Sequence, residues 1–128
     1  MDLKILDFDE EAKEADVLIR IKSGEFICYA YSFKSINELK VEKIVCSALL
    51  AKEIMLVEDN KYRLKKLSDY YSYYFQGKLV AKNMVKIDDI YIEITDYIPK
   101  DIQLGEYISF KCERVDLLFQ NEIEIPEK

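Results

Sequence analysis

Four tyrosines and one phenylalanine fall within six positions, Tyr70 to Phe75, of a chain that has no tryptophan and no histidine. Basic residues surround this run, because residues 61–86 carry seven lysine or arginine side chains and one acidic side chain, a net charge of +6. Rings that stack on bases, beside cations that contact phosphates, are a common means of binding single-stranded nucleic acid. The stretch therefore predicts one candidate ligand surface, formed by Tyr70, Tyr74, Lys65, Lys66, Lys78 and Lys82.

Acidic side chains predominate in the rest of the chain, whose formal net charge is −6. They gather in the stretch DFDEEAKEAD, residues 7–16, and in the last nine residues, QNEIEIPEK. Concentrated negative charge steers a basic protein into contact and helps to select it. The sequence therefore predicts a second candidate surface, for a basic protein partner, formed by Asp7, Asp9, Glu10, Glu11, Asp88 and Asp89.

In composition, the chain resembles small acidic β-rich proteins, such as bacterial inhibitor and immunity proteins, that neutralise a basic enzyme. This resemblance covers no motif, so it implies a type of partner and assigns no residue. Solubility is the competing interpretation of the charge, since many domains carry a net charge of about this size.

Catalytic machinery is missing from the sequence. The absence of histidine removes the usual general base, the Ser-His-Asp and Cys-His arrangements and every histidine metal site. The acidic pairs lack the loop of a calcium site, and the three glycines are too scattered for a phosphate-binding loop. Buried, inert thiols are expected at Cys28, Cys46 and Cys112. We therefore predict no catalytic residue, no metal ligand and no cofactor.

The elements that must position these residues show the two-residue period of β-strands. A β-hairpin is predicted where two alternating runs flank a turn at Ser23 and Gly24. One face of the first run is formed by Val17, Ile19 and Ile21. One face of the second run is formed by Ile27, Tyr29, Tyr31 and Phe33.

The tyrosine run has the same period. Alternation assigns Tyr71, Tyr73 and Phe75 to one face of a strand, so at least one set of rings is expected to fill the core. A further strand is predicted at residues 85–94, interrupted by a turn or bulge at Asp88 and Asp89, and another at residues 107–119.

Residues 36–52 are ambiguous between helix and strand. A helical stripe can be drawn through Val41, Ile44, Val45, Ala48 and Leu49. Residues 53–66 instead favour two strands around a turn at EDNK.

Together these elements predict a mainly β fold, a small antiparallel barrel or sandwich of five to six strands with at most one or two short helices. In strand number and length this resembles the OB-fold class of barrel, and the resemblance concerns architecture only. A length of 128 residues fits a single domain, 1–128. The acidic start lacks the features of a secretory signal and no apolar run is long enough to span a bilayer, so a cytoplasmic location is expected.

The sequence thus favours a non-enzymatic, cytoplasmic binding module. An acidic protein-interaction domain is the leading hypothesis, and an OB-like domain that binds single-stranded nucleic acid through the basic aromatic strand is the alternative. A structural subunit of a homo- or hetero-oligomer, joined through an exposed strand, is a third hypothesis.

Overall fold

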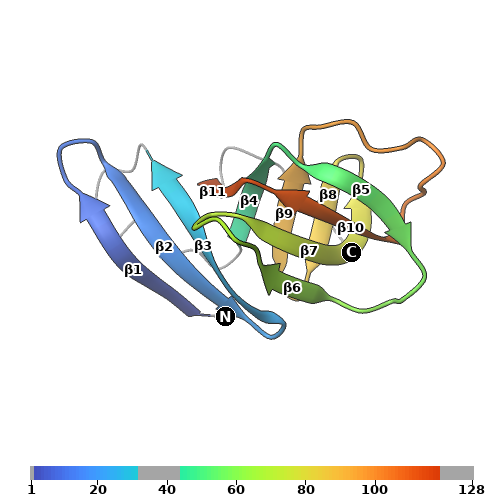
Figure 1. The fold of residues 1–128 in the computed structure, drawn as a ribbon, viewed down its shortest axis with the longest axis horizontal. Helices are drawn as coiled ribbons and strands as arrows, with labels where there is room; N and C mark the ends of the chain where they lie inside the picture. The colour runs from blue at the N-terminus through green and yellow to red at the C-terminus, as the bar shows by residue number, and fades with distance from the viewer. Residues whose placement is uncertain (1, 32–43, 119–128) are drawn as a thin grey trace.

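The computed structural model describes residues 2–31 and 44–118, which form one sheet (Figure 1). Eleven strands make up this part of the chain. In chain order they are β1 (Asp2–Asp9), β2 (Glu14–Ile21), β3 (Gly24–Tyr31), β4 (Ile44–Leu49), β5 (Lys52–Val57), β6 (Arg63–Lys66), β7 (Tyr73–Ala81), β8 (Met84–Ile87), β9 (Ile90–Ile94), β10 (Tyr107–Cys112) and β11 (Arg114–Leu118). The mainly β prediction is confirmed, and no helix in the described ranges is long and apolar enough to cross a membrane.

The strand order is β1-β2-β3-β11-β4-β9-β8-β7-β10-β5, and β6 pairs with β7 beside this path. Most neighbours are antiparallel, but β3 with β11 and β4 with β9 are parallel pairs. The sheet is not closed, since β1 and β5 form its two ends. The predicted five to six strands were an undercount, because residues 85–94 and 107–118 each form two strands, divided at Asp88 and Asp89 and at Glu113, and because β1 was not predicted.

The predicted hairpin is confirmed as β2 and β3, but its turn lies at Lys22 and Ser23, one residue earlier than predicted, because Gly24 already pairs with Ile21. Its buried face is formed by Val17, Ile19, Ile21, Phe26, Cys28 and Ala30. Tyr29 and Tyr31 lie on the opposite face, where they are accessible to solvent. Phe33 lies outside the described residues. The sheet thus buries one face of this hairpin and leaves a tyrosine-bearing face outside.

The ambiguous stretch is a strand where the structure describes it. Ile44–Leu49 forms β4, with Ile44, Val45, Cys46 and Ala48 buried, because this strand is covered on both faces. Because both faces of the strand are apolar, its residues at helical spacing are apolar too, which explains the ambiguity in sequence. Residues 36–43, including Val41, lie outside the described part. The strands expected within residues 53–66 are β5 and β6, and the turn at Asp88 and Asp89 joins β8 to β9.

The tyrosine run is divided between a loop and a strand. β7 begins at Tyr73, so Tyr70 and Tyr71 lie in the preceding loop and Tyr71 does not share the strand face predicted for it. Tyr73 and Phe75 are buried. The Phe26 ring lies 6.1 Å from Tyr73 and 5.5 Å from Phe75, measured between ring centroids. Phe75 also packs against Phe110, at 5.7 Å. The rings of this segment thus fill the core only from Tyr73 onwards.

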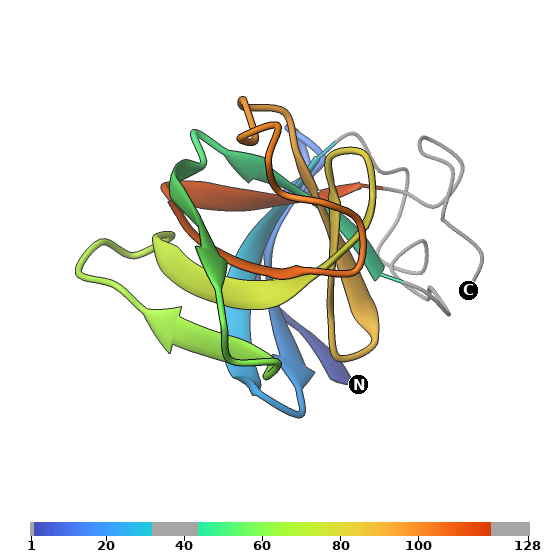
Figure 2. The same ribbon diagram turned by 90° about the vertical axis from the view of Figure 1, so that its right-hand side faces the viewer.

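Tyr73 also joins two parts of the sheet that are not paired as strands. Its hydroxyl accepts a hydrogen bond from the backbone N–H of Ile27 on β3, with an N–O distance of 2.8 Å. Nearby, the side chain of Leu64 on β6 packs against Gly24 at the start of β3. The curled sheet seen in Figure 2 therefore brings β6 and β7 against β3 through side chains.

We expect Tyr73→Phe to lower the free energy of unfolding by about 1 to 3 kcal/mol, since the Ile27 N–H would lose its acceptor while the ring stays in place. Urea denaturation followed by circular dichroism measures this change. Tyr97→Phe is the matched control, because Tyr97 is 70% exposed and its hydroxyl loss should matter by less than about 0.5 kcal/mol. Equal stability of Y73F and Y97F would contradict the role assigned to the Tyr73 hydroxyl.

Candidate functional site

The pairing register places acidic and tyrosine side chains in two rows on the outer face of the β1-β2-β3-β11 part of the sheet. One row consists of directly opposed residues Asp7, Asp16, Tyr29 and Asp116. The next row consists of Asp9, Glu14 and Tyr31. Residues two apart on a strand share a face, so the two rows form one surface. We call this surface, together with Tyr70 and Tyr71, the acidic tyrosine face.

Two pairs of carboxylates on this face oppose each other directly across neighbouring strands. Asp7 faces Asp16, and Asp9 faces Glu14, in the antiparallel β1–β2 pair. Side chains in such positions are about 5 Å apart at their Cβ atoms, and like charges there destabilise the pair. The hairpin therefore keeps a local electrostatic cost that a cation at the surface would relieve.

Tyrosine hydroxyls from the loop before β7 reach the same carboxylates. Tyr71 donates a hydrogen bond of 2.7 Å to Asp16, and Tyr70 contacts the other oxygen of Asp16 at 3.5 Å. Burial and the Asp16 carboxylate raise the pKa of the Tyr71 hydroxyl above its usual range, and hydrogen bonding to Glu14 raises the pKa of Tyr29 to about 12. These tyrosines remain neutral donors at physiological pH.

Two of the rings stay open to solvent beside the carboxylates. Tyr70 is 53% exposed and lies edge-on to Tyr71, with a centroid separation of 4.7 Å. Tyr31 is 36% exposed and stacks on Tyr29 at 5.9 Å. The acidic tyrosine face thus presents ring surface and negative charge together.

Arg114 shows how this face holds a guanidinium. The group lies over the Tyr29 ring, 4.6 Å from its centroid, and forms two hydrogen bonds of 2.6 and 3.1 Å to the Asp116 carboxylate. Hydrogen bonding to Asp116 raises the pKa of Arg114. Stacking on a tyrosine combined with a bidentate carboxylate contact is the favoured setting for an arginine side chain.

The six residues predicted to bind a basic partner do not all meet. Asp7 and Asp9 lie on the acidic tyrosine face, while Glu10 and Glu11 are exposed in the adjoining β1–β2 turn, where Asp9 accepts hydrogen bonds from the N–H groups of Glu11 and Ala12. The structure places Asp88 and Asp89 at the β8–β9 turn. Asp88 there accepts a hydrogen bond from Ser23, at the opposite end of β2 from Asp9.

The residues predicted to bind nucleic acid are also divided. Lys65, Tyr74 and Lys78 share the outer face of β6 and β7. Lys66 instead turns toward the Tyr70 and Tyr73 rings, and its amino group donates to the backbone oxygens of Asp69 and Tyr70. Lys82 is in the β7–β8 turn, beside the loop of residues 95–104.

The described thiols are all buried, and the described carboxylates form no cluster that could hold a metal ion. Cys28, Cys46 and Cys112 are buried and free, and burial raises the pKa of the Cys112 thiol to about 12. No group of three or more cysteine, aspartate or glutamate side chains that could hold a metal ion is found there.

We expect Asp16→Asn to lower the pKa of Tyr71 and Tyr70, because the amide still accepts a hydrogen bond but no longer repels a tyrosinate. Burial is unchanged, so the pKa of Tyr71 should stay above the ordinary value of 10. Ultraviolet titration of tyrosinate formation measures the shift, with Asp101→Asn in an exposed loop as the control. Superimposable titration curves for D16N and the unmodified protein would contradict the contact.

Comparison of the chain with protein families, with curated proteins and with solved structures gave no match, so its function has to be argued from this geometry.

Proposed function

We propose that the chain is a binding module whose acidic tyrosine face takes up arginine or lysine side chains of a basic protein. The observation that carries this proposal is the presence of two directly opposed carboxylate pairs, Asp7 with Asp16 and Asp9 with Glu14, beside exposed tyrosine rings. Folding stability alone disfavours such pairs, and proteins tend to keep locally unfavourable arrangements where function requires them.

The neighbouring rings support an organic cation as the ligand. A guanidinium or ammonium group over a tyrosine face gains attraction from the ring, and a nearby carboxylate adds a charged hydrogen bond. Arg114 already occupies one such position, over Tyr29 and against Asp116. Tyr31 and Tyr70 offer ring surface next to Asp16 and Glu14 for further cations.

Arginine fits this face better than lysine. Its planar guanidinium can stack on a ring and contact a carboxylate with two parallel hydrogen bonds, whereas the lysine ammonium is a strongly hydrated point charge. We therefore infer an arginine-rich segment on the partner, attracted by the carboxylates and oriented by the tyrosines.

Fluorescence anisotropy with labelled hexa-arginine and hexa-lysine peptides tests this function. We expect salt-dependent binding that is tighter for hexa-arginine, and a loss of about three- to thirtyfold in affinity for the double variant Asp7→Asn, Asp9→Asn. The same variant should gain about 0.2 to 1 kcal/mol of stability for each carboxylate pair relieved.

A charge-matched control is the double variant Asp101→Asn, Glu58→Gln, whose exposed side chains lie away from this face. It should bind hexa-arginine as the unmodified protein does. The proposal is wrong if both double variants lose the same affinity, since net charge alone would then explain the binding. It is also wrong if hexa-arginine does not bind at low salt.

A further inference from the structure

A second surface, of opposite charge, covers the outer face of the sheet around β6, β7 and β10. One row of directly paired residues is Lys65, Tyr74, Lys111 and Lys52. Another row is Lys86, Lys78 and Tyr107. Between them lie Arg63 and two buried side chains, Gln76 and Ser109, and the Gln76 amide is bonded to the loop of residues 59–61. We call these residues, together with Tyr62 beside Tyr107, the basic tyrosine face.

Like charges oppose each other directly here as well. Lys78 faces Lys86 in the β7–β8 pair, and Lys111 faces Lys52 in the β10–β5 pair. Such cross-strand pairs cost stability in the absence of a counterion. This arrangement favours an anionic ligand for the same physical reason that the acidic tyrosine face favours a cationic one.

Most of these cations keep their charge unpaired. Arg63 pairs with Asp59, and Lys111 pairs with Glu53 at 3.1 Å. Among the described residues, no ion pair is formed by Lys52, Lys65, Lys78 or Lys86. Lys65 and Lys52 lie three strands apart, about 14 Å at the usual strand spacing, so they can contact different phosphates of one chain.

Tyrosine rings lie among the lysines in fixed positions. Tyr62 and Tyr107 pack with a centroid separation of 5.7 Å and an interplanar angle of 41°, and the Lys86 amino group lies 5.7 Å from the centre of the Tyr62 ring. The Tyr74 hydroxyl donates a hydrogen bond of 3.1 Å to Gln76. Rings held in this way lose little freedom when a base stacks on them.

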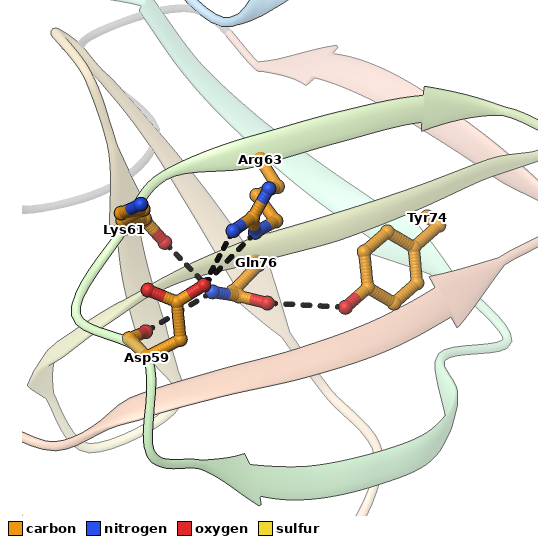
Figure 3. Close-up of polar contacts among 5 residues, drawn as sticks. All are labelled: Asp59, Lys61, Arg63, Tyr74 and Gln76. Atoms are coloured by element: carbon orange, nitrogen blue, oxygen red, sulfur yellow. Dashed lines mark hydrogen bonds and ion pairs between the residues drawn. The ribbon is translucent and has the colours of Figure 1, made fainter.

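Gln76 organises the loop that carries Tyr62. Its amide group, only 3% exposed, donates hydrogen bonds of 3.1 and 2.9 Å to the backbone oxygens of Asp59 and Lys61 (Figure 3). Asp59 in turn holds Arg63 at the start of β6. The loop is thus fixed to β7 through Gln76 and to β6 through Arg63, and Tyr62 is placed beside Tyr107.

A hollow adjoins these side chains. It has a volume of about 590 Å³, and its lining includes Tyr62, Arg63, Lys65, Tyr74 and Lys111. This size is within the range of small-ligand sites. Cations and tyrosine rings therefore form much of the lining, beside Ser23, Leu64 and Leu67, of a space that can accept a base and its phosphate.

We infer that the basic tyrosine face binds single-stranded nucleic acid, with bases against the tyrosine rings and phosphates against the unpaired lysines. The three rings are half-buried, and stacking on their accessible part requires unpaired bases, whose faces a duplex conceals. An acidic protein would satisfy the lysines but would leave the rings without flat partners. The ligand class therefore follows from the combination of both side-chain types on one face.

The net charge of −6 does not prevent this contact. Screening at physiological salt limits exposed charges to about 8 Å, so a ligand at the surface experiences mainly the charges of that surface. The carboxylates of the acidic tyrosine face lie on other strands, β1, β2, β3 and β11. The two faces therefore act on their ligands separately.

Anisotropy of a labelled 12-nucleotide oligo(U) and oligo(dT), at several salt concentrations, tests the inference. We expect saturable binding that weakens with salt, and a duplex of the same length should bind less tightly. The double variant Lys52→Gln, Lys78→Gln removes one member of each lysine pair, so it should fold normally. The slope of log affinity against log salt, which is negative, should become shallower by about 1.4. Tyr62→Leu should weaken binding roughly five- to hundredfold and leave the slope unchanged.

The control for charge is Lys4→Gln, Lys100→Gln, which alters two exposed lysines away from this face and should leave the affinity unchanged. An equal loss in this control would overturn the inference, as would failure of both oligonucleotides to bind at low salt. Binding of heparin or hexa-glutamate as tightly as oligo(U), with no effect of Y62L, would also overturn it, because the rings would then have no part in recognition.

Discussion

The hydrogen bond from the Ile27 N–H to the Tyr73 hydroxyl holds the curled sheet together where strand pairing does not. Tyr73 buries its ring against Phe26 and Phe75 and directs its polar atom to the edge of β3. Burial raises the pKa of this hydroxyl, so it remains neutral and can stay in the core. Because β7 is fixed to β3 at this residue, the loop before it is brought to Asp16 and the strand after it carries Tyr74 and Lys78 outward.

Both outer surfaces follow from strand register. Alternation sends every second side chain outward, and register decides which of them become neighbours. On one side this brings Asp7 against Asp16, and on the other it brings Lys78 against Lys86. All four side chains lie outside the core, so their charges do not affect how the core packs. The charges are thus free to serve ligands, at a modest cost in stability.

The sequence carries enough local information to predict the β2–β3 hairpin and the turn at Asp88 and Asp89, because alternation and turn residues are short-range signals. It does not reveal that β3 pairs in parallel with β11, which places Tyr29 next to Asp116. Arg114 and Asp116 therefore escape a site prediction based on neighbouring residues, and Tyr107 escapes it because its neighbour Lys78 comes from the pairing of β10 with β7. The signal that was present is the spacing of two between Glu14 and Asp16 and between Tyr29 and Tyr31, which already assigns each pair to one strand face.

Strands β10 and β11 are separated by Glu113 alone, whose N–H donates to the Leu49 backbone oxygen. Tyr107 and Lys111 of the basic tyrosine face and Arg114 and Asp116 of the acidic tyrosine face therefore belong to two successive strands, with only a bend at Glu113 between them. No loop lies between the two surfaces along these strands to absorb a displacement. The covalent backbone, rather than side-chain packing, sets the distance between them. A displacement of one surface is therefore transmitted to the other.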